Sequence, residues 1–229
     1  MVCVEDLWKK YPGAWALRGV SLTVARGRVL GVLGENGSGK STLFRILAGL
    51  TRSTRGQARI GETPTGFATK PVVAYLPEVD PFYPRMGVGE QLAFLSAFHA
   101  TWNAERARRL LEFMNLPEDR RVGALSRGQR ARLKVVSAFS WSSEVVLMDE
   151  PLGGIDPPSR RRILNSLFGE FRNPEQTILI STHLVSEVEP FIEDVLLLRD
   201  GEVFVAGQKD RLQEEHGKSL SEIFETAVA

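Results

Sequence analysis

The stretch GENGSGKST at residues 34–42 constrains the fold of this chain more than any other segment. It matches the pattern G-x-x-x-x-G-K-[ST], in which glycines let backbone N–H groups close on phosphate oxygens and the lysine balances their charge. An apolar segment at 28–34 precedes it, and residues 40–50 follow with leucines at helical spacing. A strand, a glycine-rich turn and a helix in this order predict a phosphate-binding loop. A glycine turn without a ligand is the weaker interpretation.

The rest of the chain alternates apolar strands with amphipathic helices. Residues 1–30 carry turn signals between short apolar runs, which predict antiparallel strands. Further strands are expected at 71–76, 144–149, 177–182 and 194–200, and helices at 88–140, 158–171 and 185–192. Fully apolar strands alternating with helices indicate an α/β fold with a mostly parallel sheet that is covered on both faces.

The helical block interrupts this alternation, so we interpret it as an inserted subdomain. We therefore expect a single domain over residues 1–229. Its core would comprise residues 1–78 and 141–229, including an antiparallel β part at the N-terminus, and residues 79–140 would form the helical subdomain.

Composition removes several classes of function. The formal net charge is +1, so no overall field favours nucleic acid or an anionic membrane surface, and we expect no nucleic-acid partner. A single cysteine, Cys3, cannot form an internal disulfide. No apolar run approaches the roughly 20 residues that a membrane-spanning helix needs. We therefore expect a cytoplasmic protein that reaches a membrane only through a partner.

Acidic residues follow the apolar strand VVLMDEP at 145–151. Asp149 is placed to hold Mg²⁺ near the phosphates, and Glu150 to polarise an attacking water. His183 ends the run STH after another apolar strand, at the sheet edge where ligands gather, and could contact a γ-phosphate or that water. An ordinary acidic turn and an ordinary loop histidine are the alternatives. The other two histidines, His99 and His216, are interpreted as structural.

A second potential phosphate site opens the segment ALSRGQRARLKVV at 124–136. Ser126 is a typical helix cap, and the free N–H groups of a helix start can bind an anion. The alternative is a capped surface helix. Tyr11 precedes a Pro-Gly turn, and its ring could stack on a purine or pack within a hairpin; the sequence leaves these two interpretations equal.

Together these motifs resemble those of the ATP-binding cassette (ABC) ATPases. The order and spacing of the motifs match that family, and the resemblance covers essentially the whole chain. Residues 34–42 resemble the Walker A phosphate loop, LSRGQ at 125–129 the family signature, and 145–150 Walker B. GGIDP at 153–157 is similar to the D-loop, and His183 to the switch histidine. The resemblance implies a P-loop NTPase fold of the RecA-like type. It also implies an ATPase in which two copies pack head to tail, so that each signature caps the ATP held by the other copy.

The resemblance assigns the expected site residues. Glu150 and His183 would be catalytic, and Mg²⁺ would be held by Ser41, Asp149 and Glu78. The residues expected to contact ATP are Tyr11, Asn36, Gly37, Ser38, Gly39, Lys40, Ser41, Thr42, Glu78, Ser126, Gly128 and Gln129.

Three positions depart from the commonest family pattern. Arg127 replaces the first glycine of the signature pair, and Gly153 replaces the usual D-loop serine. Glu78 replaces the Q-loop glutamine, which adds a charge and removes an amide donor. The Glu78 form, the short helical block and the ending SLSEIFETA at 219–227 resemble the branch that energises drug, lipid and polysaccharide exporters through a separate permease chain.

The segment between residues 78 and 101 is expected to bind that permease. Phe82, Tyr83 and Met86 are crowded around two prolines, and such residues are enriched at protein interfaces. The alternative is that Phe82 and Tyr83 pack into the domain's own core. Two other functions are weighed against the transporter motor: a soluble ABC ATPase of DNA repair or translation, and a nucleotide-sensing regulator. The sequence does not favour the soluble ATPase, because it contains no long coiled coil and no zinc-binding cysteine pair. It does not favour the regulator, because the expected catalytic residues are intact.

Overall fold

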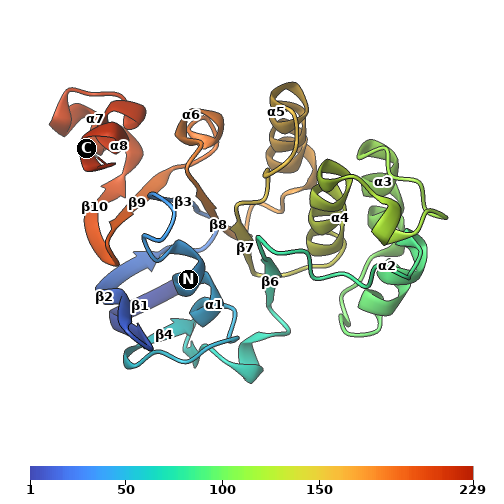
Figure 1. Ribbon diagram of the computed structural model, residues 1–229, viewed down its shortest axis with the longest axis horizontal. Helices are drawn as coiled ribbons and strands as arrows, with labels where there is room; N and C mark the ends of the chain where they lie inside the picture. Colours follow the sequence, from blue (N-terminus) through green and yellow to red (C-terminus); the bar gives the residue numbers. More distant parts are fainter. Residues whose placement is uncertain (229) are drawn as a thin grey trace.

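The protein contains two β-sheets and a group of helices, as seen in a computed structural model that describes residues 1–228 (Figure 1). The smaller sheet is antiparallel, with strand order β2-β1-β4-β5, and the larger has six strands in the order β10-β9-β3-β8-β7-β6. The strands are β1 (Val2–Tyr11), β2 (Ala14–Val24), β3 (Val29–Leu33), β4 (Arg55–Ile60), β5 (Thr63–Pro64), β6 (Val73–Leu76), β7 (Val145–Asp149), β8 (Thr177–Thr182), β9 (Asp194–Arg199) and β10 (Glu202–Gln208).

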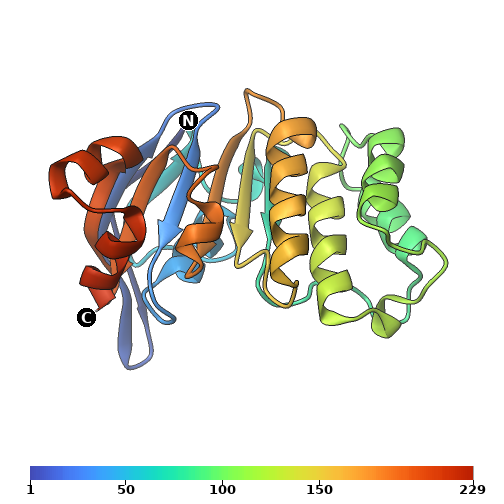
Figure 2. The ribbon, with the colours of Figure 1, turned by 90° about the horizontal axis from the view of Figure 1, so that it is seen from above.

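The helices cover the large sheet and extend beyond it. They are α1 (Lys40–Leu47), α2 (Val88–Ser96), α3 (Ala104–Phe113), α4 (Arg127–Phe139), α5 (Pro157–Ser166), α6 (Val185–Val188), α7 (Lys209–His216) and α8 (Leu220–Val228), with short turns η1 (Phe67–Thr69), η2 (Val122–Ala124) and η3 (Leu167–Phe171), the last a π-helix. Figure 2 shows α2, α3 and α4 grouped at one end of the molecule and α7 and α8 at the other. No helix within residues 1–228 is long and apolar enough to cross a membrane.

The large sheet is buried on both faces because its strands alternate their side chains between two cores. Strand β3 shows this directly: Val29 and Leu33 pack with the helices α2 to α6, whereas Leu30 and Val32 pack with α1 and the antiparallel sheet. Strands β6, β7, β8, β3 and β9 are parallel, and β10 alone runs antiparallel beside β9. The expected α/β fold with an N-terminal antiparallel part and a helical insert is confirmed.

Two expected helices are shorter than their sequence patterns suggested. The expected helix at 158–171 is α-helical only to Ser166 and then widens into the π-helix η3. The expected helix at 185–192 forms only one turn, α6, which ends at Val188. Glu189 is its C-cap and Pro190 follows, which cannot donate the next helical hydrogen bond. The strand β10, which the sequence analysis did not anticipate, pairs with β9 as the second arm of a hairpin.

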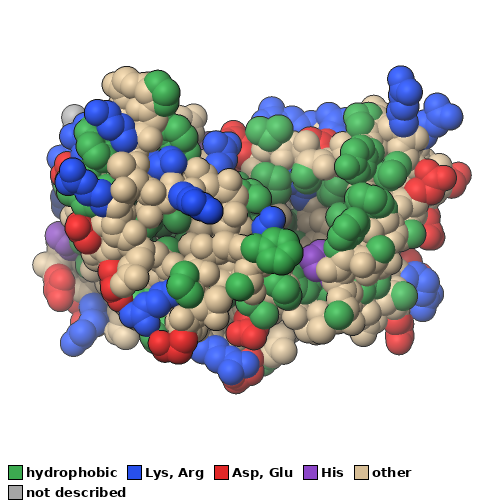
Figure 3. Space-filling model, turned by 90° about the horizontal axis from the view of Figure 1, so that it is seen from below, with side chains coloured by type: hydrophobic (Ala, Val, Ile, Leu, Met, Phe, Trp, Pro, Cys, Tyr) green, Lys and Arg blue, Asp and Glu red, His purple; other side chains and the backbone are tan. Residues whose placement is uncertain are grey.

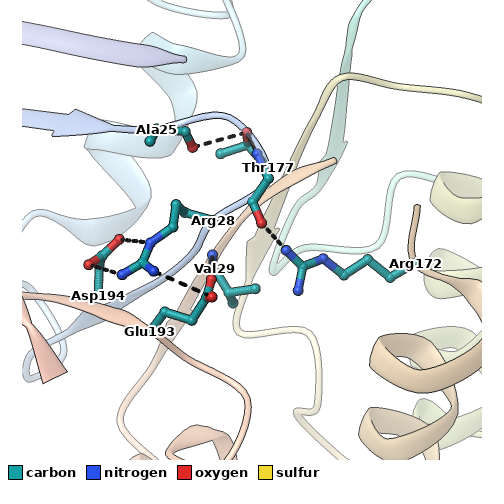
Figure 4. Close-up of polar contacts among 8 residues, drawn as sticks. Ala25, Arg28, Val29, Arg172, Thr177, Glu193 and Asp194 are labelled. Carbon is teal, nitrogen blue, oxygen red and sulfur yellow. Dashed lines mark hydrogen bonds and ion pairs between the residues drawn. The ribbon is translucent and has the colours of Figure 1, made fainter. Parts of the chain in front are cut away.

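The amino ends of the central strands are tied together by polar contacts (Figure 4). Arg28 donates two hydrogen bonds to Asp194, from Nε at 2.9 Å and from Nη2 at 2.7 Å, and the Val29 N–H donates to Glu193 at 2.9 Å. Arg172, just after η3, donates to the carbonyl of Gly27. These contacts fix the edge of the sheet where β3 and β9 begin, leaving the carboxyl edge for the functional residues.

Candidate functional site

The phosphate loop joins β3 to α1 and has a backbone that requires glycine. Gly39 has φ of +106°, and a Cβ atom there would lie 2.5 Å from the carbonyl oxygen of Ala16. A Cβ at Gly34 would lie 2.4 Å from the carbonyl oxygen of Leu198. Neither contact is possible for a real side chain, so the loop holds its shape only with glycine at both positions. The hydroxyl of Ser38 is buried within the loop and has no hydrogen-bond partner among the described residues, as expected of a group that waits for a ligand.

Lys40 projects across the mouth of this loop. Its ammonium donates to the carbonyls of Gly34 at 2.7 Å and Glu35 at 2.8 Å. Burial lowers the pKa of Lys40, and the nearby carboxylates of Glu150 and Asp149 act in the opposite direction. The loop thus presents a desolvated cation, which interacts strongly with phosphate oxygens.

Asp149 is the buried acid at the end of β7. Its Oδ1 accepts from the Ser41 hydroxyl at 3.1 Å and from the Ser181 hydroxyl at 2.7 Å, and its Oδ2 accepts from Tyr75 at 3.3 Å. Burial beside this carboxylate raises the pKa of Tyr75, so the phenol stays protonated as a donor. A carboxylate and a serine hydroxyl side by side form an oxygen pair that suits Mg²⁺, which usually takes one or two protein ligands.

Glu150 has a strained backbone, with φ of +45° although it is not glycine. Its N–H is held by Ser181, whose carbonyl accepts at 3.1 Å and whose hydroxyl oxygen accepts at 3.2 Å. Strain of this kind gathers at functional sites. The Glu150 carboxylate then contacts Nδ1 of His183 at 3.0 Å, which brings the two expected catalytic residues together. His183 is half exposed, whereas Glu150 is 14% exposed.

Two adjoining cavities surround these groups. One, of about 310 Å³, is lined by the phosphate loop, including Asn36, Gly37, Lys40, Ser41 and Thr42, together with Glu78 and Glu150. The second, of about 410 Å³, shares Asn36, Glu78 and Glu150 with the first and adds His183. The expected phosphate, metal and catalytic residues therefore meet at the carboxyl edge of the sheet, where ligands bind in open α/β folds.

Three signature residues lie outside both cavities. Ser126 caps α4 by accepting from the N–H of Gln129 at 3.2 Å, and the Gln129 side-chain oxygen accepts from the Ser126 N–H at 2.9 Å. Ser126, Gly128 and Gln129 line neither cavity. Figure 1 shows α1 and α4 in separate parts of the molecule, with β6 and β7 between them. Arg127 is the one signature residue that lines the larger cavity, whereas Ser126, Gly128 and Gln129 lie away from the phosphate loop of their own chain.

Tyr11 is also outside both cavities. It ends β1 with its ring 38% exposed and the Lys9 ammonium 5.0 Å from the ring centre. Ala16, on the adjacent strand β2, lines the smaller cavity. The purine-stacking role of Tyr11 therefore stays a prediction.

Two residues of the site were not predicted from the sequence. Ser181 supports both acids, and Lys134 donates to the carbonyls of Pro77 at 2.7 Å and Glu78 at 3.0 Å, which positions the Glu78 segment. Ser181 carried a signal, because it is a polar residue at the end of an otherwise apolar strand. Lys134 carried none, since a lysine in a basic helix is ordinarily solvent-exposed.

The segment expected to bind a permease is corrected in one respect. Phe82 is only 9% exposed and belongs to the core that contains α2 and α4, whereas Tyr83 is 54% exposed. The expectation that both rings face a partner is therefore wrong for Phe82, which packs in the domain's own core, the alternative considered for this pair. The Asp80 carboxylate accepts from the Phe82 N–H at 3.2 Å, in a turn that leads the ring inward.

Comparisons with known proteins agree with this site. The family model described as "ABC transporter" matches residues 17–153, more than half of the chain. The Nod factor export ATP-binding protein I of Ralstonia nicotianae is 33% identical over 233 residues, covering 98% of this chain and 72% of that protein. A solved structure described as an ATP-binding subunit of an ABC transporter aligns over 100% of both chains at 26% identity, with a TM-score of 0.90.

A second solved structure is the cassette MJ0796 in a dimeric post-hydrolysis state bound to ADP and Pi. It covers 91% of this chain and 98% of its own, with a TM-score of 0.80 at 22% identity, a likeness of fold. The fold and the phosphate loop define a nucleotide-binding α/β ATPase. The chain belongs to the ABC transporter family: it is the ATP-binding subunit of an ABC transporter and an ABC ATPase.

Proposed function

We propose that two copies of this chain, or one copy and a paralogous ATPase, bind MgATP between them head to tail and drive an exporter permease. The observation that carries this proposal is the separation of the signature from the phosphate loop within one chain. Ser126 and Gly128 start a helix whose free N–H groups suit a phosphate, yet no phosphate loop of the same chain faces them. A second copy supplies one.

In each site, the loop N–H groups and Lys40 would hold the phosphates, and Ser41 and Asp149 would hold Mg²⁺, with Glu78 lining the same cavity. The metal would neutralise charge that develops on the phosphate oxygens. Glu150 accepts the proton of a water as that water attacks the γ-phosphorus. The bond from the γ-phosphorus to the oxygen that joins the β- and γ-phosphates of ATP breaks, and ADP leaves with that oxygen. His183, 3.0 Å from the Glu150 carboxylate, orients this base.

An apolar groove suits the permease. It has a volume of about 350 Å³ and is lined by Tyr75, Phe82, Leu95, His99 and Trp141, among others. Figure 3 shows hydrophobic side chains gathered around a hollow on this face. Leu50, another lining residue, is exposed, as are Phe67, Tyr83, Phe94 and Phe98 in neighbouring segments of the chain. Several large apolar side chains exposed in one region are typical of a protein-binding surface.

The groove connects to the ATP site through the Glu78 segment, because Pro81 and Phe82 line the groove while Glu78 lines the nucleotide cavities. Docking here would place the protein at the cytoplasmic face of the cell membrane. Export is supported by the Glu78 form of the site and by the relative that exports Nod factors.

Glu150→Gln tests the proposed reaction. The amide keeps the size of the side chain but cannot accept the proton, so turnover should fall about 100-fold or more while ATP binding persists. Unhydrolysed ATP should then hold a dimer, visible as a doubled mass in light scattering. Glu62→Gln, at a 92% exposed side chain on the antiparallel sheet, is the matched control and should behave as the wild type. Near-normal turnover of Glu150→Gln would remove this residue from the role of base.

A further inference from the structure

Arg127, the residue that departs from the common signature, has a cationic group without a partner. Three basic side chains from α4 line the larger cavity beside the ATP site. Arg130 pairs with Asp80 at 2.9 Å, and Lys134 donates to two backbone carbonyls. Within residues 1–228, the Arg127 guanidinium makes no hydrogen bond and no ion pair, although its side chain is exposed and borders a cavity that contains Glu78 and Glu150.

The stem of Arg127 is nevertheless held in place by the D-loop. A Cβ atom on Gly154, where φ is +81°, would lie 2.6 Å from Cγ and 2.7 Å from Cδ of Arg127. The arginine stem therefore occupies space that any other residue at 154 would fill. A Cβ on Gly153 would lie 3.8 Å from Nη2 of Arg127. The serine that is usual there would bring a hydroxyl close to the guanidinium, whereas glycine leaves its N–H donors available.

Gly153, a departure from the family pattern like Arg127 itself, and its neighbour Gly154 therefore both suit an arginine at position 127. A glycine D-loop seats the arginine stem and offers the guanidinium no side-chain acceptor. An arginine that is fixed in position but retains its donors is prepared for an external anion, and its planar fork matches phosphate oxygens in pairs.

We propose that Arg127 is a phosphate ligand that binds the γ-phosphate of the partner copy's ATP and so favours ATP over ADP. This role rests on the proposed head-to-tail dimer, because Arg127 lies between Ser126 and Gly128, which that dimer places on the same phosphate. The added cation also offsets the charge that Glu78 brings to the nucleotide site.

The test measures ATP-driven dimerisation of the Glu150→Gln chain by light scattering. Adding Arg127→Ala should raise the ATP concentration for half-maximal dimer by about tenfold or more, the effect of one charge-assisted hydrogen bond. Arg127→Lys should fall in between, since it keeps the charge but not the fork. Binding of ADP to the monomer should not change. Arg161→Ala removes the same charge from the exposed face of α5 and should leave dimerisation unaltered.

Mixed dimers show whether Arg127 binds the ATP held by the partner copy or the ATP held by its own chain. With differently tagged Glu150→Gln chains, a Lys40→Ala copy is paired with an Arg127→Ala copy. If Arg127 acts on the partner's ATP, this pair has one complete site and captures ATP at concentrations where Arg127→Ala alone stays monomeric. If it acts within its own chain, the complete site arises instead when the Lys40→Ala, Arg127→Ala double variant is paired with an otherwise unaltered copy.

Equal dimerisation of Arg127→Ala and its parent would overturn the proposal, as would capture only by the second pairing. A Glu150→Gln parent that stays monomeric at every ATP concentration would overturn the proposed dimer itself, and with it this role for Arg127. The two failures are therefore distinguishable.

Discussion

Phe82 and Tyr83 are adjacent aromatic residues with opposite environments, and separate serine substitutions should distinguish them. The Phe82 ring is 9% exposed and packs in the helical core. Truncating a buried phenylalanine typically destabilises a protein by about 3–5 kcal/mol. For a chain of this size each kcal/mol lowers the melting temperature by about 2–4 °C, so Phe82→Ser should melt roughly 10 °C lower.

Tyr83→Ser should cost much less. Its ring is 54% exposed, and its one aromatic contact is an edge-on approach to Phe94 at 5.5 Å between ring centres. An aromatic pair contributes about 0.5–1.5 kcal/mol, so the melting temperature should fall by a few degrees at most. Its backbone N–H still donates to Gln91 at 2.9 Å, which the substitution does not affect.

The assays are a calorimetric melt, ATPase activity in solution and co-purification with the permease from membranes. We expect Tyr83→Ser to keep the first two close to wild type and to weaken the third. Phe204→Ser, at a 42% exposed ring on β10, is the control for losing an exposed aromatic outside the groove. A Phe82→Ser protein that melts within two or three degrees of wild type would refute the assignment of this ring to the core. Full permease recovery with Tyr83→Ser would refute the docking surface.

Two further predictions concern the signature helix and the groove. Ser126→Arg should leave ATP binding to Lys40 intact but abolish the ATP-driven dimer, because a long side chain fills the space of the partner's phosphate. Ser126→Ala removes the helix cap, at about 1 kcal/mol, together with the hydroxyl expected to contact phosphate, so it should weaken the dimer less than Ser126→Arg does; equal ATPase rates for wild type and Ser126→Arg would favour a plain capped helix. Burial against Trp141 lowers the pKa of His99 below its ordinary 6.5, so stability is complete above that pH and falls as the pH drops below it. Urea melts at pH 8 and pH 5.5 should show a smaller loss for His99→Phe than for wild type, and parallel losses would contradict this.

The sequence was sufficient for the fold and the phosphate chemistry because both depend on local patterns. Apolar runs of strand length fix the sheet, and glycine spacing fixes the phosphate loop. The inward turn of Phe82 depends on tertiary packing, and nothing in a proline-flanked aromatic pair tells one ring from the other. The Arg127 contact with Gly154 likewise joins segments that only the folded chain brings together. The division of the chain at residues 79 and 140 stays a prediction.

The contacts of Glu150 also could not be predicted from the sequence. The position of the acid after a strand suggested its role, but not that His183 would lie 3.0 Å away or that Ser181 would support both acids. These depend on the parallel register of β7 and β8, which pairs Asp149 with Ser181. Register is a property of the assembled sheet.

The left-handed backbone at Glu150 makes thermal stability and ATP hydrolysis compete at a single residue. A non-glycine residue in this conformation costs about 1–3 kcal/mol, and glycine adopts it without that penalty. Directed evolution that rewards only heat resistance would therefore accept glycine at position 150, and the resulting protein would fold better while lacking the base. The backbone strain at Glu150 is therefore a cost in stability that comes with the proposed base and that a glycine would not carry.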